Sequence, residues 1–142
     1  MLSYCRSVFL SSWSALEGWI NYVAYSFAKA DQTLNPFEVA FLLEQRIEVD
    51  ENGEIKLLKH PEFHSTLTKL LFIMKKFGNN FDFKHSEDDL WRNLMEIQKT
   101  RHSIVHPKDR EQDFTLTLRN TEKCYETIVK TVELLKDKIF GS

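Results

Sequence analysis

One apolar stripe near the N-terminus constrains the fold of this chain more than any other feature. Large apolar side chains recur there at spacings of four, three, four, three and four residues. This spacing places them on one face of an α-helix, which turns once every 3.6 residues. The sequence therefore predicts a first helix over residues 3–30 with a long apolar face that other elements must cover. The stripe comprises Phe9, Trp13, Leu16, Ile20, Val23 and Phe27.

The rest of the chain is predicted to form mainly further amphipathic helices. Asn35-Pro36 is a typical helix start, because asparagine caps helices well and proline suits the first helical position. His60-Pro61 is interpreted as a second start, and Ser86 as the N-cap of a helix that Pro107 ends. The predicted helices cover residues 37–45, 62–77, 86–106 and 113–140. The last of them is expected to bury Tyr125, Ile128, Val132, Leu135 and Ile139.

A short segment between two of these helices has a different pattern. Ile47 and Val49 alternate with charged residues, Asn52-Gly53 is a strong turn signal, and the alternation resumes at Ile55 and Leu57. This predicts a β-hairpin over about residues 46–58. A two-stranded hairpin is marginally stable by itself, so it must pack against the helices or against another subunit.

Composition agrees with an all-α fold. The chain has 142 residues with only four glycines and three prolines, which is few turn formers for a many-stranded protein. We expect a single domain over residues 1–142, a four- to five-helix bundle with a small β-hairpin insertion. The two cysteines are expected to be reduced and buried in a cytoplasmic protein. Because the N-terminal apolar stretch carries Glu17, a core helix is expected there rather than a membrane span.

The residue that stands out is Arg101. It lies on the apolar seam of its predicted helix, between Ile97 and Ile104, and arginine is rarely buried there unless it is paired. His102 follows it, and His106 lies five residues beyond it, directly before Pro107. The side chains of Arg101 and His106 can converge on one ligand only if the helix ends near His106.

The segment Arg101-His102-Ser103-Ile104-Val105-His106 resembles the Arg-x4-His signature of the HEPN superfamily (higher eukaryotes and prokaryotes nucleotide-binding). The resemblance implies a helical bundle with the motif near the end of a later helix. Many HEPN proteins are metal-independent endoribonucleases of toxin–antitoxin, phage-defence or RNA-processing systems, and they usually act as homodimers with a composite active site. By position, Arg101 and His106 are the implied catalytic pair, with His102 as the polar residue that orients the site.

The residue types fit this chemistry. Imidazole can accept or donate a proton near neutral pH, and the arginine fork matches phosphate oxygens. We therefore expect RNA cleavage by 2′-OH attack, without a cofactor or a metal, leaving a 2′,3′-cyclic phosphate. The formal net charge of −2 excludes a broad basic coat, so RNA must be held by a local cluster. Lys99, Lys108 and Arg110 are the candidate substrate-binding residues, and Glu17 and Asn21 are candidate partners that orient Arg101.

Other interpretations stay open at this stage. Arg101 can simply pair with Glu17 or cap a helix end, and His106 can be an ordinary C-terminal cap. The alternative function is a non-catalytic HEPN-like module that binds a nucleotide or a partner protein, and a third is a purely structural helical subunit. An antitoxin or regulatory protein is a further expected partner, whereas a membrane is not. His60 and His64 are four residues apart but lack a third ligand, so no metal site is expected.

Overall fold

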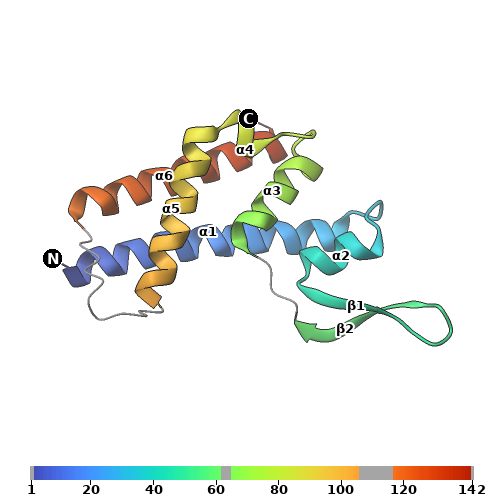
Figure 1. The fold of residues 1–142 in the computed structure, drawn as a ribbon. Helices are drawn as coiled ribbons and strands as arrows, with labels where there is room; N and C mark the ends of the chain where they lie inside the picture. Colours follow the sequence, from blue (N-terminus) through green and yellow to red (C-terminus); the bar gives the residue numbers. More distant parts are fainter. Residues whose placement is uncertain (1, 62–64, 106–116, 142) are drawn as a thin grey trace. The chain divides into compact units, whose positions relative to one another are not determined.

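A computed structural model describes residues 2–61, 65–105 and 117–141 of the chain (Figure 1). The described residues are mainly helical, with one small antiparallel sheet, which confirms the predicted all-α fold with a β-hairpin. No helix in these ranges is long and apolar enough to cross a membrane. The elements in chain order are α1 (Leu2–Ala30), α2 (Pro36–Leu42), β1 (Gln45–Val49), β2 (Ile55–Pro61), α3 (Thr66–Phe77), α4 (Phe83–Ser86), α5 (Asp88–Val105) and α6 (Leu118–Phe140).

The chain forms two compact units. The first unit consists of Met1–Glu17 and Leu71–Ser142, and the second consists of Gly18–Leu70. Helices α1 and α3 therefore contribute residues to both units. The organisation of residues 1–142 as one domain stays a prediction.

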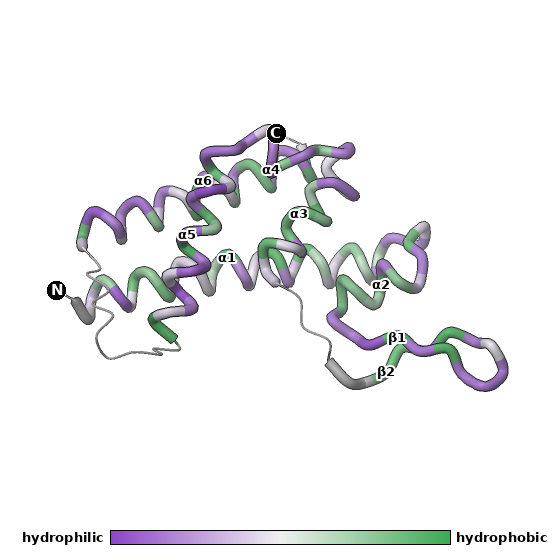
Figure 2. Tube along the Cα trace, in the orientation of Figure 1, coloured by the Kyte–Doolittle hydropathy of each residue, from purple (hydrophilic) through white to green (hydrophobic). Residues whose placement is uncertain are grey.

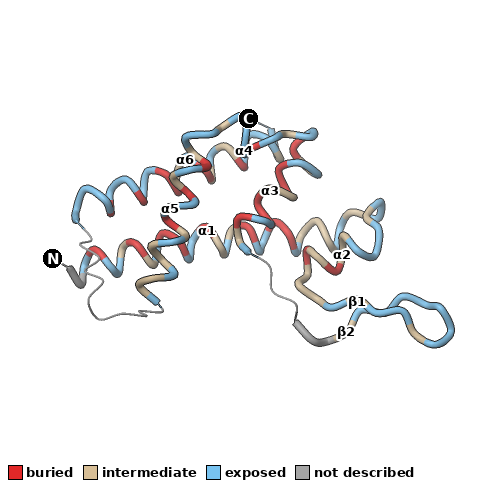
Figure 3. Tube along the Cα trace, in the orientation of Figure 1, coloured by how far each residue is buried: buried red, intermediate tan, exposed pale blue. Residues whose placement is uncertain are grey.

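The first unit contains α4, α5 and α6, and α5 packs against both of the others. The ring of Phe83 in α4 meets Trp91 in α5 edge to face, with ring centroids 5.9 Å apart. Leu94 and Ile97 continue the buried face of α5 toward its C-terminus. Figure 3 shows buried residues recurring along one side of each long helix, as the sequence periodicity predicts.

Helix α6 differs from its prediction in two ways. It begins at Leu118, with Thr117 as N-cap, rather than near Asp113, which lies outside the described residues. Tyr125 was expected in the core but is 57% exposed, whereas Cys124 and three threonines are buried. The hydroxyls of Thr121, Thr127 and Thr131 donate to backbone carbonyls four residues earlier. A threonine whose hydroxyl is hydrogen-bonded in this way can be buried in the core. A prediction based only on the spacing of apolar residues misses such positions.

The second unit contains α2 and the hairpin. Helix α2 starts at Pro36 as predicted, and Asn35 and Glu38 form a reciprocal capping box. It ends at Leu42, before the predicted Gln45, because Glu44 adopts a left-handed backbone with φ of 53° and Gln45 already belongs to β1. Strands β1 and β2 pair with Ile47 opposite Leu57 and Val49 opposite Ile55. The hairpin predicted at residues 46–58 is therefore confirmed, with β2 extending to Pro61.

Two predicted helix starts are wrong. His60 and Pro61 end strand β2, and α3 begins only at Thr66. Ser86 is the last residue of the short helix α4 rather than the cap of the following helix. Proline is also tolerated at the edge or end of a strand, so a local His-Pro signal does not distinguish the two outcomes. The predicted end of α3 is confirmed, since Asn79 and Asn80 both adopt positive φ angles.

Candidate functional site

Arg101 lies near the C-terminus of α5, four residues before the last helical residue, Val105. It continues the stripe of Leu94 and Ile97, and its side chain is half-buried. The sequence therefore predicted correctly that a cation occupies the inner seam of this helix.

No hydrogen bond or ion pair joins Arg101 to any other residue in the described ranges. Arg92, on the same helix, is different: its guanidinium pairs with Asp88 at 2.6 Å and with Asp89 at 2.9 Å. The positive charge of Arg92 is thus largely neutralised within the first turns of α5, whereas the charge of Arg101 is not neutralised by a described carboxylate. A half-buried guanidinium of this kind is suited to an anionic ligand.

The neighbours of Arg101 on α5 add positive and polar groups. His102 and Lys99 are exposed, and the hydroxyl of Ser103 donates to the carbonyl of Lys99 at 3.1 Å. Cations are favoured at this end of a helix because the helix dipole is negative there. The last turns of α5 therefore present three cationic or titratable side chains within four consecutive positions.

Three other residues of the predicted site follow α5 in the sequence. His106, Lys108 and Arg110 lie outside the described residues, as does Pro107. The convergence of Arg101 and His106 stays a prediction. The described residues hold no group of three or more histidine, cysteine or acidic side chains that could bind a metal ion.

Glu17 and Asn21 were predicted to orient Arg101, and each has a different neighbour in the structure. The carboxylate of Glu17 accepts a hydrogen bond from the indole Nε1 of Trp13 at 2.5 Å. The side-chain oxygen of Asn21 accepts a hydrogen bond from the ammonium group of Lys69. A role for either residue toward Arg101 stays a prediction.

Lys69 is a residue that sequence reasoning missed. It lies in α3 between the buried Leu67 and Leu70, and it is itself buried. Its ammonium group is hydrogen-bonded to both Glu44 and Asn21. The available signal was a lysine within an apolar run, but the partners lie in distant segments and could not be read from the local pattern.

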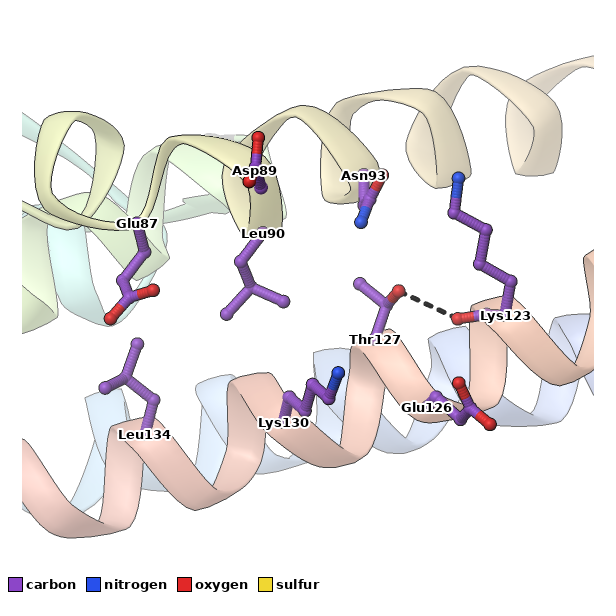
Figure 4. A pocket seen from close by; sticks show the side chains of 9 residues that line it. All are labelled: Glu87, Asp89, Leu90, Asn93, Lys123, Glu126, Thr127, Lys130 and Leu134. Atoms are coloured by element: carbon purple, nitrogen blue, oxygen red, sulfur yellow. Dashed lines mark hydrogen bonds between the residues drawn. The ribbon is translucent and has the colours of Figure 1, made fainter.

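A second polar feature is an open groove between α5 and α6 with a volume of about 500 Å³ (Figure 4). Asn93 points from α5 toward Thr127 on α6, and Lys123 and Lys130 extend from α6 beside it. Three carboxylates and two leucines complete the lining. The groove is lined by Glu87, Asp89, Leu90, Asn93, Lys123, Glu126, Thr127, Lys130 and Leu134.

Comparison with known proteins identifies the chain as a HEPN protein. The family model described as RiboL-PSP-HEPN matches residues 2–140, which is nearly the whole chain. The chain belongs to the RiboL-PSP-HEPN family. No curated protein and no solved structure matches it. The family assignment supports membership of this HEPN protein in a superfamily of nucleotide-binding domains and ribonucleases, as the sequence resemblance predicted.

Proposed function

We propose that this HEPN protein is a metal-independent endoribonuclease with Arg101 and His106 as its catalytic pair. The observation that carries the proposal is the position of Arg101: half-buried near the end of α5, without a counter-ion among the described residues. A guanidinium group without a counter-ion can bind a phosphate group without first breaking an ion pair. The family assignment supports the same chemistry.

The proposed roles follow from the residue types. Arg101 stabilises the negative charge that develops on the phosphorane, through charge-assisted hydrogen bonds to non-bridging oxygens. His106 transfers protons, because imidazole titrates near neutral pH. The 2′-OH gives its proton to a base as the 2′-oxygen attacks the phosphorus. The bond between the phosphorus and the 5′-oxygen breaks, and the 5′-oxygen receives a proton from an acid, leaving a 2′,3′-cyclic phosphate and a 5′-OH. His102 orients the pair, and Lys99, Lys108 and Arg110 hold neighbouring phosphates.

One histidine cannot be base and acid for the same bond at the same moment. We therefore include a homodimer in the proposal, in which two copies of the motif form one composite site and supply both functions. In this proposal the protein cleaves RNA in the cytoplasm, in a toxin, phage-defence or RNA-processing role. An antitoxin or regulatory protein inhibits it.

The test is incubation of the purified protein with a panel of RNAs, beside its His106→Ala variant. We expect cleavage by the parent in the presence of EDTA, products with 2′,3′-cyclic phosphate ends, and none from the variant. Equal cleavage by the variant, or activity that EDTA abolishes and a divalent ion restores, would contradict the mechanism. Circular dichroism of both proteins verifies that the variant keeps its helices.

The groove between α5 and α6 favours a second candidate, a module that binds a nucleotide without cleaving RNA. Lys123 and Lys130 could contact phosphate oxygens while Asn93 hydrogen-bonds to a base edge. Calorimetric titration with mononucleotides tests it, together with the Lys130→Gln variant. Binding that depends on Lys130, with no RNA cleavage under any condition, would favour this candidate over the ribonuclease.

A further inference from the structure

The β-hairpin presents an apolar face that the described parts of its own unit leave uncovered. Val49 is 60% exposed and Ile55, opposite it, is 44% exposed, while Leu57, opposite Ile47, is 43% exposed. Figure 3 shows most of the hairpin as exposed, and Figure 2 shows hydrophobic stretches within the same strands. Exposed apolar side chains in register on one face of a sheet indicate an interaction surface.

The two edges of this hairpin differ in how well they resist pairing. Strand β2 carries Lys56, Lys59 and a terminal Pro61. The register of the two strands shifts between Gln45 and Ile47 of β1, where β2 holds the extra residues opposite Arg46. Lysine, proline and irregular register are the usual protection of an edge strand. Strand β1 has neither lysine nor proline, and its only charged residues are Arg46 and Glu48.

Hydrogen bonding at the turn determines which backbone groups of β1 face its free edge. The N–H of Asp50 donates to the carbonyl of Glu54 at 2.8 Å, so these two residues form a hydrogen-bonded pair. Hydrogen-bonded and non-hydrogen-bonded pairs alternate along an antiparallel ladder, which makes Glu48 and Lys56 the next hydrogen-bonded pair. The N–H and C=O groups of Ile47 and Val49 therefore point away from β2. The main contacts of β1, apart from those with β2, are with α2, the helix that precedes it.

We infer that the free edge of β1 pairs antiparallel with β1 of a second copy of this chain, about a two-fold axis at Ile47. Ile47 then lies opposite Ile47 of the other copy in a hydrogen-bonded pair. Arg46 lies opposite the second copy's Glu48, and Glu48 opposite its Arg46, in non-hydrogen-bonded pairs where side chains are closest. Both pairs are oppositely charged, and neither Arg46 nor Glu48 has an ion pair among the described residues.

The same arrangement also extends the apolar face. The two-fold axis is perpendicular to the sheet, so paired residues of the two copies point to the same side. Leu57 and Ile47 of one copy then continue into Ile47 and Leu57 of the other, across a four-stranded sheet. Sheets of three or more strands with an apolar face are much more stable than a lone hairpin. The inference goes beyond the proposed ribonuclease function and does not depend on it. Its readouts are charge reversal and cross-linking at the edge of β1, whereas the homodimer of the proposed function is built on the Arg-x4-His motif.

Charge reversal tests the pairing. In Arg46→Glu both cross-copy pairs become Glu–Glu, and in Glu48→Arg both become Arg–Arg. We expect sedimentation velocity to show self-association by the parent, weakened about tenfold or more in each variant because like charges directly opposite repel. The double variant Arg46→Glu/Glu48→Arg restores both pairs, and an equimolar mixture of the two single variants forms a mixed complex.

These outcomes separate the inference from a folding defect, since neither recovery is expected if each single variant is merely misfolded. A monomeric parent, an Arg46→Glu variant that associates like the parent, or a double variant that stays as weak as the singles would overturn the inference.

A disulfide test locates the axis independently of any other contact between copies. The Cα atoms of a hydrogen-bonded pair are about 5.5 Å apart, within disulfide range. Ile47→Cys is therefore expected to form an intermolecular disulfide on mild oxidation. The matched control is Ile55→Cys on β2. Its counterpart lies three strand spacings away across the sheet, about 14 Å, and four residues away along the strands, about 13 Å, so it should not cross-link. Cross-linking of Ile55→Cys but not Ile47→Cys would show contact through the sheet face and would overturn the edge pairing.

Discussion

The ammonium group of Lys69 forms an ion pair with the carboxylate of Glu44. The side chain of Lys69 is 4% exposed, whereas that of Glu44 is 22% exposed. Asn21 accepts a second hydrogen bond from the same ammonium group. Because Glu44 lies between α2 and β1, the pair ties the base of the hairpin to α3 within the second unit.

The two partners of this pair should not be equally costly to remove. Glu44→Ala leaves a buried cation without a counter-ion, so we expect a loss of about 3 kcal/mol in the free energy of unfolding. Lys69→Met removes the buried charge and leaves a carboxylate that water can reach, so a loss of about 1 kcal/mol or less is expected. Urea denaturation of both variants measures the difference. A larger loss for Lys69→Met than for Glu44→Ala would contradict this account.

Substitution by alanine should change the stability in opposite directions at two of the glycines. A Cβ atom at Gly78 would lie 2.3 Å from the backbone oxygen of Met74, whereas nothing lies within 4 Å of one at Gly18. We expect Gly78→Ala to cost about 1–3 kcal/mol of stability through steric overlap. Gly18→Ala, in the interior of α1, should gain about 0.5–1 kcal/mol, because alanine loses less backbone entropy in a helix. Thermal denaturation of the two variants checks both signs.

The cysteine thiols should be unreactive in the folded chain. Cys5 and Cys124 are buried, and burial raises the pKa of Cys124 from 9.0 to about 12. Since the thiolate is the reactive form, we expect both thiols to react with a disulfide reagent at pH 8 only after urea unfolds the protein. Fast reaction of two thiols under native conditions would contradict the burial.

The raised pKa of Cys124 also predicts a pH dependence of stability. Above about pH 9 the thiol ionises in the unfolded chain but not in the folded one. Its stabilising contribution is therefore complete below pH 9 and declines as the pH rises toward 12. Unfolding free energies measured from pH 8 to 10.5 should fall more steeply for the parent than for Cys124→Val. Parallel curves for the two proteins would count against the assignment.

Arg101 should matter for RNA cleavage far more than a neighbouring arginine does. We expect Arg101→Gln to lower the rate about 100-fold or more, because it removes the cation that stabilises the transition state. Arg101→Lys should recover only part of the loss, since an ammonium group lacks the planar fork of donors. Cleavage rates with a defined RNA, measured alongside unfolding free energies, test this.

Arg92→Gln is the matched control for Arg101. Its guanidinium is exposed and already paired with Asp88 and Asp89, so its loss should change neither cleavage nor, by more than about 1 kcal/mol, stability. Equal losses of cleavage for Arg92→Gln and Arg101→Gln would indicate general attraction of RNA to this helix rather than a specific role for Arg101.

Features that depend on neighbours in sequence were predicted well. The stripe from Phe9 to Val23 is buried in α1, and the start of α2 at Asn35-Pro36 is confirmed. The hairpin with its turn at Asn52-Gly53 is also confirmed, because turn geometry and strand alternation are local. The position of Arg101 on the inner seam of α5 follows from the same periodicity.

Features that depend on competing local signals were predicted less well. His60-Pro61 suits both a helix start and a strand end, and the chain uses it to end β2. Tyr125 fits the apolar stripe of α6, yet the helix is rotated so that Cys124, Thr127 and Thr131 are buried instead. Which face of a helix is buried depends on the elements packed against it, and periodicity near a stripe boundary does not determine it.

The sequence by itself determined that the chain forms several long helices, which broad face of each is apolar, and that the Arg-x4-His segment begins near the end of one of them. Only the tertiary structure decided which charged groups are neutralised. Lys69 is hydrogen-bonded to Glu44, which is 25 residues away in the sequence, and to Asn21, which is 48 residues away. Arg92 is neutralised by aspartates on its own helix, while Arg101 has no such partner among the described residues. Charge pairing depends on distances through space, and folding brings together groups that no local pattern connects.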